Sequence, residues 1–72
     1  MSTVAAIGET HELQGFALVG VAVTPAANRA QVIEAWENLD DDVGLVILSR
    51  RAAETLRPML ANRRDTLTVA MP

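Results

Sequence analysis

Cysteine is absent from this chain of 72 residues, and so is lysine. Without cysteine, neither a disulfide framework nor a thiolate metal site can hold the fold, so stability must come from packing. Aromatic residues are scarce as well, because Phe16 and Trp36 are the only two. A core made mainly of alanine, valine, leucine and isoleucine favours close packing of helices on a sheet.

Long apolar runs are also missing. No stretch approaches the roughly 18 apolar residues of a membrane-spanning helix, and the N-terminus lacks the charged and apolar regions of a secretory signal peptide. We therefore expect a cytoplasmic protein with no direct membrane insertion. The length leaves room for one domain, which we place at residues 1–72.

The charge balance is acidic, with a formal net charge of −3 at pH 7. Attraction to phosphates needs a basic surface, so this balance argues against a nucleic-acid partner. Acidic residues dominate through Asp42, whereas most basic residues follow Val43. This distribution fits either two solvated surfaces or a charge-steered docking face.

Four short apolar runs are typical of strands: the first fits a strand buried on both faces, and the third fits the central strand of a parallel sheet. They cover residues 4–7, 21–24, 44–48 and 67–71. Pro25 prevents the second run from continuing as a paired central strand, since proline has no N–H to donate.

Segments with helical spacing separate these runs. The first helix follows Thr10 as its cap and stops at Gly20. Its predicted inward face consists of Leu13, Phe16, Ala17 and Gly20. The second helix opens on a capping box formed by Asn28 and Gln31. Its predicted buried stripe consists of Val32, Ala35, Trp36 and Leu39.

The acidic run at residues 40–42 follows the second helix, and we place it in a solvated turn, because the helix dipole disfavours carboxylates at a C-terminus. Ser49 is the cap of a third helix, which carries Ala52, Ala53, Leu56 and Leu60 on one side. Pro58 is expected to kink that helix or start a new turn.

Strands that alternate with helices predict an α/β fold with right-handed crossovers. We expect a four-stranded parallel sheet in the order 2-1-3-4, covered by helices on both faces. This arrangement is the three-layer, receiver-like or Rossmann-like sandwich.

Ligands of such folds bind at the carboxyl ends of the strands. Here that edge contains residues 8–11 and Ser49 with Arg50 and Arg51. Receiver phosphorylation requires an aspartate after the third strand and a lysine after the fourth, and neither is present. A single glycine flanked by acids also fails as a dinucleotide-binding turn. We therefore expect no catalytic residues and no cofactor.

Two weaker ligand hypotheses remain at this edge. An anion could bind at the helix N-terminus formed by Ser49, Arg50 and Arg51. The alternative is that Ser49 is an ordinary helix cap and the two arginines are simply exposed. His11 beside Glu9 and Glu12 would bind a metal ion, but a lone histidine in a first helical turn is usually a solvent-facing residue. We predict no metal site.

A motif carries a more specific signal. Residues 15–21, Gly-Phe-Ala-Leu-Val-Gly-Val, resemble the GF-x-L-x-G-[IV] signature of the F subunit of V/A-type ATPases, at the same position after the first strand. Its motif residues here are Gly15, Phe16, Leu18 and Gly20. Gly15 would let the first helix lie close to the sheet, Phe16 would fill the core and Gly20 would turn the chain. Residues 43–49 and 67–72 resemble other strands of that family, so the resemblance covers nearly the whole chain.

The resemblance implies a non-catalytic rotor-stalk component that binds the coiled-coil D subunit and takes part in coupling and regulation. It also implies a C-terminal segment ending in a mobile helix, whereas this sequence stops at Pro72. Arg50 and Arg51 stand where the family more often has acids, which would alter the charge of the partner surface.

The last strand is expected at a sheet edge with no following helix to cover it. Its apolar side chains, or the adjoining helix face, would then contact another chain or a second copy. The candidate contact residues are Arg57, Arg63, Leu67, Val69 and Met71. An alternative function is a stand-alone receiver-like signalling or ligand-binding domain that uses the edge near Ser49.

Overall fold

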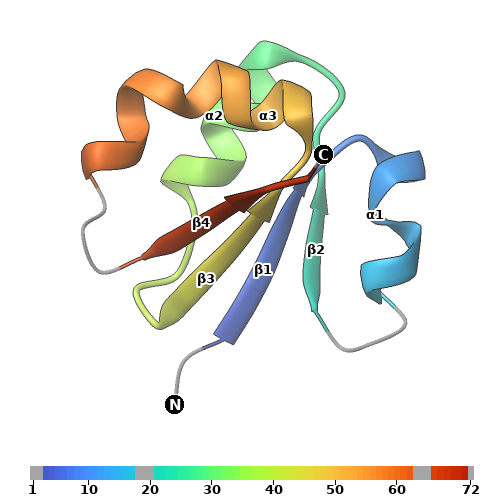
Figure 1. Ribbon diagram of the computed structural model, residues 1–72, viewed down its shortest axis with the longest axis horizontal. Helices are drawn as coiled ribbons and strands as arrows, with labels where there is room; N and C mark the ends of the chain where they lie inside the picture. The colour runs from blue at the N-terminus through green and yellow to red at the C-terminus, as the bar shows by residue number, and fades with distance from the viewer. Residues whose placement is uncertain (1–2, 18–20, 63–65, 72) are drawn as a thin grey trace.

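The computed structural model describes residues 3–17, 21–62 and 66–71. Its four strands form one parallel sheet in the order β2-β1-β3-β4 (Figure 1). The strands are β1 (Thr3–Gly8), β2 (Ala22–Pro25), β3 (Val43–Leu48) and β4 (Leu67–Ala70). The predicted α/β class and strand order are confirmed, and the strand ends differ from the prediction by only one residue.

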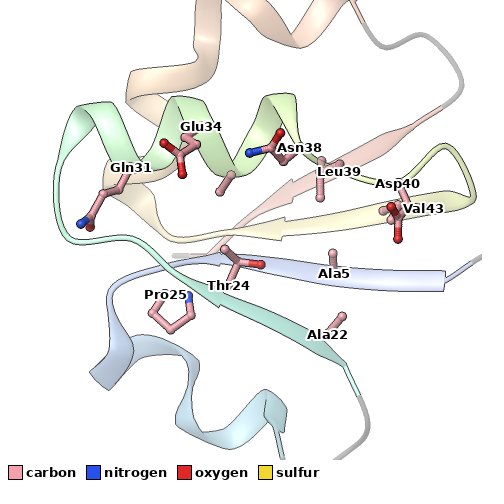
Figure 2. Close-up of a pocket in the computed structure, with 11 residues that line it drawn as sticks. Ala5, Ala22, Thr24, Pro25, Gln31, Glu34, Asn38, Leu39, Asp40 and Val43 are labelled. Atoms are coloured by element: carbon pink, nitrogen blue, oxygen red, sulfur yellow. The ribbon is translucent and has the colours of Figure 1, made fainter.

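Helices lie on both faces of the sheet. The α-helices are α1 (Thr10–Ala17), α2 (Arg29–Glu37) and α3 (Arg50–Leu56), and a 3₁₀ helix, η1 (Arg57–Asn62), continues α3. Helix α1 packs on β1 and β2, whereas α2 and α3 pack together over β1 and β3. Figure 2 shows α1 and α2 on opposite sides of the sheet, which makes the predicted three layers.

Two side-chain caps set where α2 and α3 begin. The Asn28 side-chain oxygen accepts a hydrogen bond from the Gln31 backbone N–H at 2.9 Å, and the Gln31 side chain accepts one from Ala27 N at 2.7 Å. The Ser49 hydroxyl accepts one from Ala52 N at 3.2 Å. Both caps satisfy backbone donors that a helix start leaves free, as predicted.

Helix α3 becomes a 3₁₀ helix at Arg57, immediately before Pro58. Proline lacks the N–H that an α-helix needs there, and its ring crowds the preceding turn. The predicted change at Pro58 is therefore confirmed. The acidic residues 40–42 lie exposed in the turn after α2, which also agrees with the prediction.

The main core lies between the sheet and the pair α2 and α3. It includes Ile7, Val46, Leu48 and Leu56, which are almost fully buried, and Trp36, which is 3% exposed. The inward positions predicted for α2 are confirmed at Val32 and Trp36, while Ala35 and Leu39 are partly buried.

The opposite face has a smaller packed region under α1. Leu13 is 1% exposed, which confirms the predicted inward side of this helix at that position. The side chains of Phe16 and Ala17, and all of Leu18 and Gly20, lie outside the described part of the chain. Their predicted core and turn roles stay predictions.

Candidate protein-interaction surface

An apolar stretch of the sheet lies on the face that carries α1, beyond the area that α1 covers. We call it the open sheet face, and it consists of Val4, Leu45, Ile47, Leu67 and Val69. Alternate residues of β1 and β3 belong to the core under α2 and α3, so the residues between them point to the other side. Register then brings the set together, because Leu45 pairs with Leu67, and Ile47 with Val69.

Exposure rises across this face toward the edge of the sheet. Val4, Leu45 and Ile47 are partly buried, whereas Leu67 is 71% exposed and Val69 is 51% exposed. Among the described residues, α1 packs mainly on β1 and β2, on the side of the sheet away from β4 (Figure 1). Contiguous exposed apolar side chains of this kind mark contact sites for other molecules.

Strand β4 is an edge strand, as predicted, since it pairs only with β3. Met71 continues the pairing beyond the strand, where its N–H donates to Leu48 O at 2.8 Å, and its side chain is partly buried. The edge thus combines backbone groups open to pairing with apolar side chains on one face.

Not every predicted contact residue belongs to this surface. Arg57 is exposed, but it lies at the end of α3, in the helical layer on the other side of the sheet from Leu67 and Val69. Arg63 lies outside the described residues. The structure therefore assembles the apolar candidates and separates them from Arg57.

Ser49 lies at the carboxyl end of β3, where an anion site was considered. Its side chain is 1% exposed, and its hydroxyl donates to a Glu9 carboxylate oxygen at 3.2 Å while accepting from Ala52 N. A carboxylate therefore already occupies the position that an anion would take, and repulsion opposes a second negative group. The anion site stays a prediction, and this geometry counts against it.

Arg50 and Arg51 are exposed beside Ser49 and line a hollow of about 520 Å³ together with Glu9, His11 and Glu12. Ligand atoms of these last three residues lie within 4.8 Å of one another, and His11 Nε2 is 3.5 Å from Glu12 Oε1. The His11 side chain is 75% exposed, as expected for a solvent-facing residue. The two arginines offset the acids, so the hollow is electrostatically mixed.

Gly15 does not have the packing role predicted for it. It is exposed on α1, and a Cβ added there would meet no atom within 4 Å. The prediction that Gly15 permits close approach to the sheet is therefore wrong. A different close contact involves Gly8 at the end of β1, where an added Cβ would lie 2.6 Å from the Ser49 Cβ.

Sequence reasoning missed Val4, Leu45 and Ile47 as parts of the open sheet face. Their runs were interpreted as strands buried on both sides, because continuous apolar sequence is typical of such strands. The order of the elements carried a usable signal: of the described helices, only α1 lies on that face, and it connects the adjacent strands β1 and β2.

The fold is shared with a solved component of an ATP synthase. The crystal structure of the F subunit of the V-type ATP synthase from Archaeoglobus fulgidus matches with a TM-score of 0.83 and 22% sequence identity, over 99% of this chain and 98% of that chain. A comparison with curated protein sequences finds no significant match. None of the helices in the described residues is long and apolar enough to cross a membrane.

A family model extends this likeness to the sequence itself. The model described as ATP synthase (F/14-kDa) subunit matches residues 4–72, which is almost the whole chain. The matched region includes the glycine-containing motif at residues 15–21 and all of the four strands except Thr3 at the start of β1. Members of this family are non-catalytic components of ATP synthase, in agreement with the expectation that the chain is not an enzyme by itself. The chain belongs to the family of the ATP synthase (F/14-kDa) subunit.

Proposed function

We propose that this chain is a central-stalk (rotor) subunit of a V/A-type proton- or sodium-translocating rotary ATPase. In this role it binds the coiled-coil D subunit and contributes to coupling or regulation. It works on the cytoplasmic side, held at the membrane periphery by the complex rather than by insertion. Membership of a family of ATP synthase subunits supports a role among the other subunits of that enzyme.

The observation that carries the proposal is the exposure of Leu67 and Val69 on the open sheet face. A coiled coil presents long helices, and helices are what normally cover the faces of a parallel sheet. Burying these two side chains removes apolar area from water, which favours association. The D subunit is therefore assigned to this face and to the β4 edge beside it.

The test compares two variants of adjacent residues on β4. Val69 and Ala70 are both exposed, but Val69 pairs with Ile47 on the open sheet face, and Ala70 pairs with Leu48 on the other face. Val69→Lys places a charge in the proposed contact and should weaken binding to the coiled coil of the D subunit by about tenfold or more. Ala70→Lys is the matched control and should change the dissociation constant by less than about twofold.

Sedimentation over a range of concentrations, with and without the coiled coil, gives the measurement. Equal binding by the two variants, or no complex with the wild-type chain, would remove the open sheet face from the proposal. If the isolated wild-type chain self-associates and Val69→Lys abolishes this self-association, the face would be assigned to a second copy of the chain instead.

A further inference from the structure

A second surface lies on the opposite side of the sheet, between α2 and the edge strand β2. It is a groove of about 400 Å³, which we call the α2–β2 groove. Figure 2 shows Ala5, Ala22 and Thr24 rising from the strands toward the side of α2, with Glu34 and Asn38 above them on the helix. Among the described residues, α2 packs mainly on β1, and the groove lies in the space between α2 and β2.

The floor of the groove consists of small side chains. Ala5 is 4% exposed at the bottom, and Ala22 and Ala35 line the two sides. Alanine side chains leave room for larger apolar groups of an incoming partner to reach the sheet, and Val43 closes one end with further apolar surface. The floor of the groove is therefore apolar and has room for apolar side chains, while Thr24, Gln31 and Asn38 add polar groups to its lining.

The rim of the groove is acidic. Glu34 and Asp40 line it, both are exposed, and none of its lining residues is basic. Neither carboxylate forms an ion pair within residues 3–17, 21–62 and 66–71. The C-terminus of α2 adds the partial negative charge of the helix dipole, and the last turn of α2 has no basic residue to offset it.

We propose that the α2–β2 groove docks a basic amphipathic helix of another protein chain. Its apolar side chains enter the alanine-lined floor, and its arginine or lysine side chains reach Glu34 and Asp40. A helix fits better than an added strand, because the groove lies over the face of β2 and not along its edge, and helices are what cover such faces.

A second copy of this chain does not supply that partner from its described helices. Basic residues occur together at Arg50 and Arg51 on α3, with Arg57 just after it, but the apolar residues of α3, Ala52 and Leu56, are buried in its own core. The occupant is therefore a different chain. This contact is separate from the one proposed for the open sheet face, since the two surfaces lie on opposite sides of the sheet.

The test uses the full chain labelled with ¹⁵N and a synthetic stapled helix as the probe. The probe has leucines three and four positions apart and arginines on the flanking positions, and a matched probe has glutamate in place of each arginine. The arginine probe should bind with a dissociation constant below about 1 mM. Its largest amide shifts should fall on Ala22, Glu34 and Asp40. The glutamate probe should not bind, because the rim would repel it.

Two double variants separate the groove from general electrostatics. Glu34→Arg with Asp40→Arg should weaken binding of the arginine probe by about fivefold or more. Glu37→Arg with Glu54→Arg changes the net charge equally, yet Glu37 lies on another side of α2, where it lines a hollow with Trp36 and Met59. This control should leave the affinity within about twofold. All four positions are exposed, and the amide spectrum of each variant checks its fold.

The proposal is overturned if the arginine probe causes no saturable shifts up to about 1 mM. It is equally overturned if the shifts map to the open sheet face, or if the control pair weakens binding as much as the groove pair. Concentration-dependent shifts of the groove amides without any probe would assign the groove to a second copy of this chain and would also overturn it.

Discussion

Gly8 and Ser49 approach each other so closely that no side chain fits at residue 8. A Cβ placed on Gly8 would lie 2.6 Å from the Ser49 Cβ and 2.8 Å from its hydroxyl oxygen. The Ser49 N–H donates to Ile7 O at 3.0 Å, which ties the ends of β1 and β3 together at this point. The missing side chain at Gly8 is what leaves room for the buried Ser49 cap.

Gly8→Ala should therefore destabilise the protein by about 1–3 kcal/mol, because the added methyl group must displace packed backbone and the Ser49 side chain. Gly15→Ala is the matched control, since an added Cβ there meets nothing and alanine favours a helix. This control should stabilise the protein by about 0.5–1 kcal/mol. Urea unfolding measures the change in the free energy of unfolding for both variants. If both substitutions destabilise the protein, or both stabilise it, the packing described here is contradicted.

Trp36→Ala should cost about 3–5 kcal/mol, because it removes the largest side chain of the core between α2 and the sheet. A loss of this size is comparable with the whole stability of many small domains. Glu37→Ala, at the exposed neighbouring position, should have little effect. Thermal melting compares the variants, and an unchanged midpoint for Trp36→Ala would show that the inward side of α2 is misassigned.

The two helix caps should differ in their importance. Ser49→Ala removes the acceptor for Ala52 N in a buried position, where water cannot replace it, so we expect a loss of about 1–3 kcal/mol. Asn28→Ala removes an equivalent acceptor at an exposed helix start and should cost only about 0.5–1 kcal/mol. Chemical denaturation gives both values. A larger loss for Asn28→Ala would contradict the importance given to burial.

The isolated chain should neither hydrolyse ATP nor bind it tightly. The strand ends present Glu9, whose carboxylate accepts from Ser49, together with Glu12, and these acids repel phosphates despite Arg50 and Arg51 nearby. Calorimetric titration with ATP and magnesium should show no binding as tight as a dissociation constant of about 1 μM. Tight binding that is lost in an Arg50→Ala, Arg51→Ala variant would instead establish the anion site.

Local chemistry made most of the elements predictable. The helix starts at Asn28 and Ser49 could be located because each has a capping side chain, and the break before Pro58 follows from a missing N–H. The inward positions of α2 followed from helical spacing. Alternation of strands with helices then restricted the topology, since crossovers between parallel strands are right-handed.

Contacts between segments that are far apart in the chain were harder to predict from the sequence. A close packing role was predicted for Gly15, but the glycine that needs to lack a side chain is Gly8, against Ser49. A glycine in a motif does not reveal which neighbour it will face. The open sheet face was missed at Leu45 and Ile47, since an apolar run has the same sequence whether one or both of its faces are covered.

By itself the sequence determined the parallel α/β fold, the order of its strands and the likeness to the F subunit, because periodicity, caps and a short motif are local properties. Only the tertiary structure decided which apolar residues stay exposed on β4, how Glu9 reaches Ser49 and where an acidic rim borders the alanine-lined groove beside α2. These features depend on register and on which area each helix covers. Both are set by the packing of segments far apart in the chain, and no local pattern encodes them.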